Sequence, residues 1–240
     1  MRIGNKWAAF VYRLVIVAAA AVGLGIQTGL LGSDGLNLGS LRYFTLLSNL
    51  VCLVYFLVDA FFCLRRGRNA CPRLKGAIAM AITVTGIVYH TMLSGDAFSM
   101  GGVDDPMFGS ALGQLGNQLL HTVVPIMTVG DWLLFDEKGT YRLSCPFIWT
   151  LLPDAYFVYA TARGFLLPAA FHGDRFPYPF INYDMLGWKV IPIVIGLNVA
   201  FILLGFVYLG VDRLLAKSKA ASGTGSGITG GSEGEAGTRG

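Results

Sequence analysis

Polar side chains recur at helical spacing inside two strongly apolar segments. In the first segment, steps of four and three residues connect Thr45, Asn49, Cys52, Phe56 and Asp59. In the second, the same kind of stepping connects Asn117, His121, Val124, Thr128 and Asp131. Such spacing places each set on one face of a helix. Both segments are expected to run from outside to inside, so both place an aspartate near the cytoplasmic end. Two stripes of the same polarity indicate that the two faces meet a common interior.

Thr45 and His121 are the two members of these stripes that could together perform nucleophilic catalysis. A threonine hydroxyl attacks an ester carbonyl only when a base accepts its proton, and a neutral imidazole is the usual base. If Asp59 and Asp131 lie at the same depth, Thr45 lies about 6 Å further from that depth than His121. The difference arises because Thr45 precedes its aspartate by four more residues of helical rise than His121 does. A helix tilt of about 20° absorbs this offset. The spacing therefore permits a hydroxyl–imidazole contact.

Further polar residues are candidates to support that pair. A tetrahedral intermediate needs hydrogen-bond donors for its oxyanion, and the base needs a neighbour that orients it. The supporting candidates are Asn49, Asn117, His90, Arg163 and Tyr178. Each also has a plainer interpretation, because Asn and His in apolar helices often serve only as interhelical hydrogen-bond partners.

Pro125 predicts an irregular helix next to His121. Proline has no N–H, so the carbonyl of His121, four residues earlier, loses its usual helical donor. We expect a kink at this position and an acceptor that needs another neighbour.

Acidic residues lie near the predicted cytoplasmic ends of the spans. A charge inside the hydrocarbon is costly, so these acids are expected to pair with nearby bases or to reach interfacial water. The acids are Asp59, Asp131 and Asp212, and the nearby bases are Arg65, Arg66 and Arg213 or those of the basic loops.

The composition places all these residues in a membrane protein. Of the 240 residues, 54% are hydrophobic and only 13% are charged, whereas about 25% are charged in a soluble domain. The mean hydropathy is +0.60. So few charges cannot cover a soluble fold of this size. A disordered chain, a disulfide scaffold and a nucleic-acid-binding protein are therefore poor interpretations.

Six segments are long and apolar enough to cross a bilayer as helices, which requires about 20 residues each. We expect an all-α bundle of six spans in a domain covering residues 1–217. The spans run over about 8–31, 43–64, 77–95, 114–135, 146–168 and 186–215. The first could instead be a signal peptide, but its apolar stretch is too long for one.

Charge orients the predicted bundle. Most of the 18 Lys and Arg residues fall in the N-terminus, the second and fourth loops and the tail, whereas the loop 95–113 has three Asp and no Lys or Arg. By the positive-inside rule, both termini are cytoplasmic and the protein is a multi-pass protein of the cell membrane. The Gly/Ser-rich tract 218–240 is predicted to be a disordered cytoplasmic tail.

Three short motifs resemble those of one six-span family. Tyr43-Phe44-Thr45 is similar to its Y-[FL]-T motif, Asn117 to Thr122 followed by Pro125 is similar to N-x-x-x-H-T, and Pro177 to Phe180 is similar to Y-P-F. The family is that of the androgen-induced and androgen-dependent membrane proteins of animals, with bacterial six-span relatives. The resemblance covers about residues 8–215 in layout.

The resemblance implies a function. Animal members hydrolyse fatty acid esters of hydroxy fatty acids with an intramembrane Thr and His, which correspond to Thr45 and His121. The chain departs from the family at Gln118, where animal sequences tend to have a second His, and His90 could take that place. The implied ligand is a membrane lipid or a lipid-like ester. No cofactor and no nucleic-acid partner is expected, and the sequence leaves the oligomeric state open.

Other functions remain open at this point. A polar interior with Pro125, Pro153 and Pro192 in the spans also fits a transporter or lipid-binding membrane protein without catalysis. His90 and His121 could ligate a haem, although two histidines are weak support. An outer divalent-metal site is a further option, less favoured than a solvated acidic loop. Its ligands would be Asp96, Asp104, Asp105, His172 and Asp174.

Overall fold

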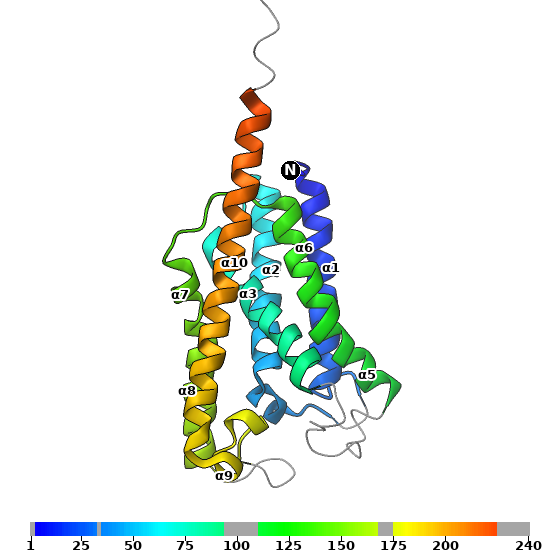
Figure 1. Ribbon diagram of the computed structural model, residues 1–240. Helices are drawn as coiled ribbons and strands as arrows, with labels where there is room; N and C mark the ends of the chain where they lie inside the picture. Colours follow the sequence, from blue (N-terminus) through cyan, green and yellow to red (C-terminus); the bar gives the residue numbers. More distant parts are fainter. Residues whose placement is uncertain (1–2, 33–34, 94–109, 168–174, 225–240) are drawn as a thin grey trace, which may run out of the picture.

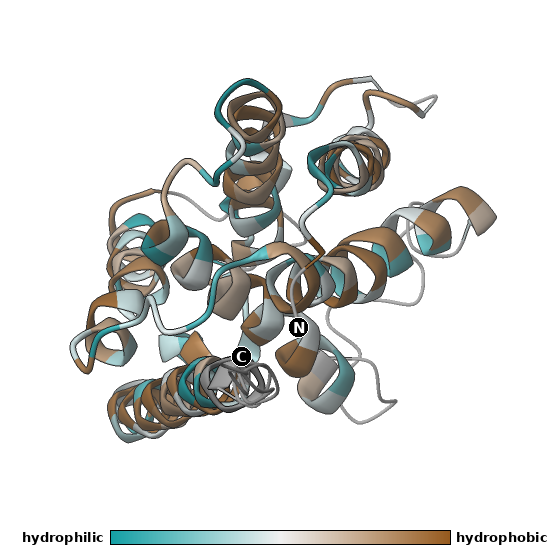
Figure 2. Cartoon of the chain, turned by 90° about the horizontal axis from the view of Figure 1, so that it is seen from above, coloured by the Kyte–Doolittle hydropathy of each residue, from teal (hydrophilic) through white to brown (hydrophobic). Residues whose placement is uncertain are grey.

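The protein is a bundle of long helices (Figure 1). The computed structural model describes residues 3–32, 35–93, 110–167 and 175–224, and within them there are helices and turns but no strand. Five helical segments of this described part are long and apolar enough to cross a membrane. They are Lys6–Gln27, Phe44–Arg66, Pro72–Met92, Ala111–Phe135 and Tyr183–Ser218. Apolar residues surround these helices on their outer as well as their inner faces, as in a membrane protein (Figure 2).

The core of the bundle is formed by four of these segments. α1 (Lys6–Gln27) packs along α2 (Phe44–Arg66), and α3 (Pro72–Val88) contacts both α2 and α6 (Val124–Phe135). α5 (Ala111–Gln118) continues into α6 through a short irregular turn and packs on α1. The N-terminal end of α1 and the C-terminal end of α10 (Val190–Thr224) lie at the same end of the bundle (Figure 1).

The predicted span 146–168 consists of two helices rather than one. They are α7 (Cys145–Trp149) and α8 (Leu151–Leu166), and neither reaches membrane-spanning length alone. Pro153 explains the break, because its missing N–H leaves the carbonyl of Trp149, four residues earlier, without a helical donor. Between the two helices, the hydroxyl of Thr150 donates to the carbonyl of Phe147 at 2.8 Å.

The irregularity predicted at Pro125 takes the form of a π-helical turn. This turn, η4 (Leu119–Val123), carries His121, and the amide of Val124 donates to the carbonyl of Leu119 five residues earlier. A second π-helical turn, η2 (Tyr89–Leu93), ends α3 and carries His90. π-helical turns are rare and are found mainly at functional sites. Here both histidines of the described residues lie on one.

Asp59 and Asp131 pair with Lys75, a base of the segment predicted as the basic second loop, and with Arg13 of α1. Arg65 and Arg66 are not their partners. Arg13 Nη1 lies 3.1 Å from Asp59 Oδ2 and its Nε lies 3.0 Å from Asp131 Oδ1. Sequence proximity suggested the arginines at the end of α2, but the bundle brings in α1 and α3 instead. The resulting buried cluster consists of Arg13, Asp59, Lys75, Asp131 and Asp136, with each side chain at most 2% exposed.

Asp212 also differs from its prediction, since its carboxylate accepts the backbone N–H of Tyr141 at 3.1 Å rather than pairing with Arg213. Helix α10 continues to Thr224, past the point where the disordered tail was expected to begin at residue 218. The remaining tail, 225–240, and the loop acids Asp96, Asp104, Asp105 and Asp174 with His172 lie outside the described residues.

Candidate active site

Thr45 and His121 are in direct contact. Thr45 lies in the first turn of α2, His121 lies in η4, and the Thr45 Oγ1 atom is 3.0 Å from the His121 Nε2 atom. The Thr45 side chain is buried, with 7% of the residue exposed. The contact that the spacing of the two stripes permits is therefore present, at a distance suited to proton transfer.

A backbone carbonyl sets the direction of this hydrogen bond. The His121 Nδ1 atom lies 3.0 Å from the carbonyl oxygen of Asn117. A carbonyl oxygen only accepts, so Nδ1 carries the proton and Nε2 presents its lone pair to Thr45. Thr45 then donates its hydroxyl proton to His121. The carbonyl of Asn117 thus does what the acid of a catalytic triad does when it fixes the imidazole tautomer.

Tyr89 packs against the face of the imidazole. Its ring stacks on that of His121, with centroids 4.1 Å apart and planes 25° apart. Its hydroxyl accepts the Asn117 side-chain amide at 2.6 Å. Asn117 therefore reaches the base twice, through its own carbonyl and through Tyr89. Sequence analysis missed Tyr89; its position beside His90 on an apolar segment was the one available signal.

Asn49 connects the two helices that carry the pair. Its side-chain nitrogen donates to the carbonyl of Thr45 at 2.8 Å and to that of Leu120 at 3.3 Å. Both hydrogens are thus directed at backbone carbonyls, and the residue is fully buried. This geometry favours a structural connection between α2 and η4 over the oxyanion role considered from sequence.

Tyr178 lies at the N-terminal end of α2. Its hydroxyl accepts the backbone N–H of Phe44 at 3.0 Å, and it is also hydrogen-bonded to Thr45. Burial raises the pKa of Tyr178 to about 12, and the hydrogen bonds with Thr45 and Phe44 partly offset that rise. The phenol is therefore protonated at neutral pH and can donate to an oxyanion formed beside Thr45.

His90 and Arg163 do not join the pair. His90 Nε2 lies 3.0 Å from the Thr122 hydroxyl, which itself donates to the Gln118 side chain at 2.9 Å. His90 lines the same pocket as His121, whereas Thr45 lines the other of the two pockets described below. Arg163, in the last turn of α8, lines neither pocket.

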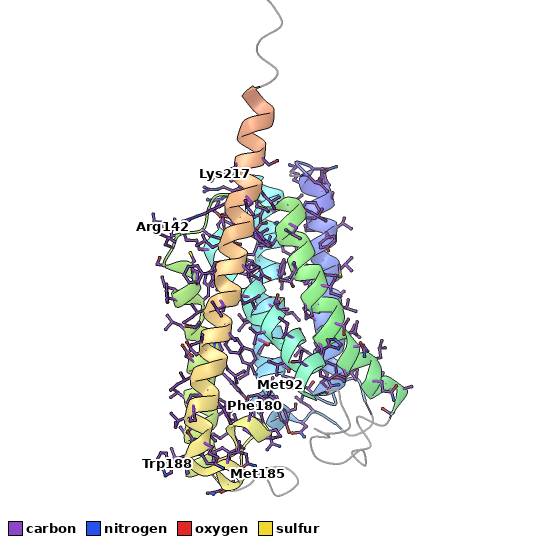
Figure 3. All side chains as sticks on the ribbon, viewed as in Figure 1. Met92, Arg142, Phe180, Met185, Trp188 and Lys217 are labelled. Carbon is purple, nitrogen blue, oxygen red and sulfur yellow. The ribbon has the colours of Figure 1, made fainter. Side chains whose placement is uncertain are left out.

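Two pockets open beside the contact. The Thr45 pocket lies between α2, α3, α8, η5 (Pro179–Ile181) and α10, and its mostly apolar lining includes Tyr178. Phe180, which also lines it, lies near the lower end of α10 in Figure 3. The His121 pocket lies between α3, η4 and α6. An apolar ligand in the first pocket would meet the Thr45 hydroxyl.

In the described residues, no group of three or more His, Cys, Asp or Glu side chains is placed to hold a metal ion. Haem ligation by His121 would displace one of the two partners that its ring nitrogens already have.

No family model, no characterised relative and no solved structure matches the chain.

Proposed function

We propose that the protein is a membrane hydrolase of lipid-like esters, with Thr45 as nucleophile and His121 as base. One observation carries the proposal: Thr45 Oγ1 lies 3.0 Å from His121 Nε2, while His121 Nδ1 is occupied by the Asn117 carbonyl. A buried hydroxyl directed at the free lone pair of a fixed imidazole is the arrangement that nucleophilic catalysis requires. The apolar pocket beside Thr45 supports a lipid substrate.

The reaction follows from these positions. Thr45 Oγ attacks the ester carbonyl carbon while its proton passes to His121 Nε2, and the carbonyl oxygen becomes an oxyanion beside the Tyr178 hydroxyl. Collapse expels the alcohol, which takes the proton from His121 and leaves an acyl group on Thr45. Water then attacks the acyl carbon, gives its proton to His121, and releases the carboxylic acid as Thr45 recovers its hydrogen.

The membrane arrangement belongs to the same proposal. α7 and α8 together form one further span, the fifth in chain order. With the five helices that are long and apolar enough on their own, this gives six spans. Both termini are cytoplasmic, which the positions of the basic residues support. The site then lies in the outer half of the cell membrane. The three motifs support a place in the androgen-induced and androgen-dependent family and its bacterial branch.

Turnover of long-chain p-nitrophenyl esters by the purified, folded protein tests the function. Thr45→Ala and His121→Gln should each lower kcat by at least about a hundredfold, in the range seen when a nucleophile or base is removed. Thr128→Ala provides a matched control, because Thr128 is equally buried but lines neither pocket. Its turnover should stay close to that of the wild type.

Unchanged turnover in both site variants would contradict the proposal. Lipid binding without turnover in the wild type would instead favour the alternative function, a transporter or a lipid-binding membrane protein.

A further inference from the structure

A carboxylate lies in the Thr45 pocket without a basic partner. Asp154, on α8, is half-buried and lines this pocket together with Asn198 of α10. The Asn198 side-chain amide donates to the Asp154 carboxyl at 2.5 Å. Among the described residues, no Lys, Arg or His nitrogen lies within 4.0 Å of this carboxyl. Asp154 lies in the first turn of α8, within the span that we propose for α7 and α8. A carboxyl inside a membrane span is costly, and such groups often face a ligand or an ion pathway.

Aromatic rings surround the same space. A cation is attracted to the face of an aromatic ring, and quaternary ammonium groups are bound in cages of such rings. The aromatic residues lining the Thr45 pocket are Phe44, Tyr156, Phe157, Tyr178, Phe180 and Phe201. A carboxylate and aromatic faces in one apolar pocket are complementary to an ammonium group attached to an apolar chain. An anionic chain end would instead meet Asp154 with like charge.

We propose that the Thr45 pocket binds an amphiphile that carries an ammonium group, with Asp154 as its counter-ion and the aromatic side chains around its methyl groups. Asn198 orients the Asp154 carboxyl toward this group. As a statement about substrates, the inference rests on the proposed hydrolase function, because the same pocket presents Thr45 to the ester. As a statement about binding, it stands without catalysis.

Three fluorescent probes separate charge from shape. Each has a dansyl group on the same dodecyl chain, and the chain ends in trimethylammonium, in tert-butyl or in carboxylate. The first two ends have nearly the same shape and differ in charge. The wild-type protein in nanodiscs of neutral lipid should bind the ammonium probe at least about tenfold more tightly than the tert-butyl probe, as expected for a desolvated cation–aromatic contact with a counter-ion. The carboxylate probe should bind least.

Asp154→Asn preserves the shape of the side chain and removes its charge, so the preference for ammonium should fall below about threefold. Asp184→Asn is the matched control, because Asp184 is an exposed acid that lines neither pocket and pairs with Arg175. It should leave the preference unchanged. The wild-type probe comparison remains decisive even if the Asp154 variant does not fold.

Thr45→Ala distinguishes the two proposals. If ester turnover is absent in the wild type but both the wild type and Thr45→Ala prefer the ammonium probe, the hydrolase proposal fails and the binding inference stands. Equal binding of the ammonium and tert-butyl probes by the wild type would overturn the inference, whatever the turnover. An unchanged preference in a folded Asp154→Asn variant would overturn the assignment of Asp154.

Discussion

The rings of Tyr89 and His121 stack with their centroids 4.1 Å apart, and each ring projects from a π-helical turn. Tyr89 therefore fixes the plane of the imidazole, while the Asn117 carbonyl fixes its tautomer. Two contacts, connected by the hydrogen bond from Asn117 to Tyr89, thus hold Nε2 toward Thr45. Both come from outside α2, the helix that carries the nucleophile.

Two substitutions of Tyr89 should distinguish the contribution of its ring to kcat from that of its hydroxyl. Tyr89→Phe keeps the stacked ring and loses the hydrogen bond from Asn117, so kcat should fall about two- to threefold. Tyr89→Leu also loses the ring contact, and the loss should reach about tenfold, the size expected for one aromatic pair. KM should stay unchanged in both, because Tyr89 does not line the Thr45 pocket. A change in KM alone in ester assays would count against a positioning role.

Gly86 allows α3 to approach the base closely. A Cβ atom at this position would lie 3.0 Å from the carbonyl oxygen of His121 and 3.4 Å from the ring of Pro125. Gly86→Ala should therefore push η4 away, lowering both kcat and the free energy of unfolding, the latter by about 1–3 kcal/mol. Gly196 has no atom within 4 Å of such a Cβ, so Gly196→Ala should be neutral or stabilise its helix by up to about 1 kcal/mol. Thermal unfolding and ester turnover of both variants check this, and equal effects would contradict the close approach.

Asn49→Ala should lower stability and turnover together. The substitution removes two hydrogen bonds and leaves the buried carbonyls of Thr45 and Leu120 without these donors. Each lost bond of this kind costs about 1–3 kcal/mol. If Asn49 instead donated to the oxyanion, kcat would fall while the melting temperature stayed the same. Chemical denaturation and kinetics on one preparation distinguish the two roles.

Asp136 should make stability depend on pH. The buried cluster has three carboxyls against two bases, and one oxygen of Asp136 has no hydrogen-bond partner. Burial raises the pKa of Asp136, which Lys75 partly offsets. The pKa of Asp136 is therefore higher in the folded than in the unfolded protein. Its contribution to the free energy of unfolding is fully present below the unfolded pKa of about 4 and is lost as the pH rises through the folded pKa.

The corresponding measurement is the melting temperature of the wild type and of Asp136→Asn between about pH 4 and about pH 8, where a carboxyl with a raised pKa titrates. The melting temperature of the wild type should fall relative to that of Asp136→Asn as the pH rises. Asp184→Asn, a change at an exposed acid of α9 (Tyr183–Leu186), should run parallel to the wild type. Parallel curves for Asp136→Asn and the wild type would contradict the raised pKa.

Helical periodicity predicted the two polar stripes, and their common direction permitted the contact between Thr45 and His121 that the structure contains. Periodicity assigns a residue to a face but not to a partner on another helix. The partners of Asp59 therefore could not be read from neighbouring arginines, since Arg13 reaches it from α1. The stacking of Tyr89 depends on the π-helical turns, which add a residue to the helical repeat and rotate the faces that simple spacing predicts.

The central claim is that His121 activates the Thr45 hydroxyl. Peptide mass spectrometry after treatment with a fluorophosphonate tests it most directly, because the reagent forms a covalent bond only with an activated hydroxyl. We expect the adduct on Thr45 in the wild type, retained on the new hydroxyl in Thr45→Ser and absent in a folded His121→Gln variant. An adduct on another residue, or equal labelling of Thr45 without His121, would contradict the claim.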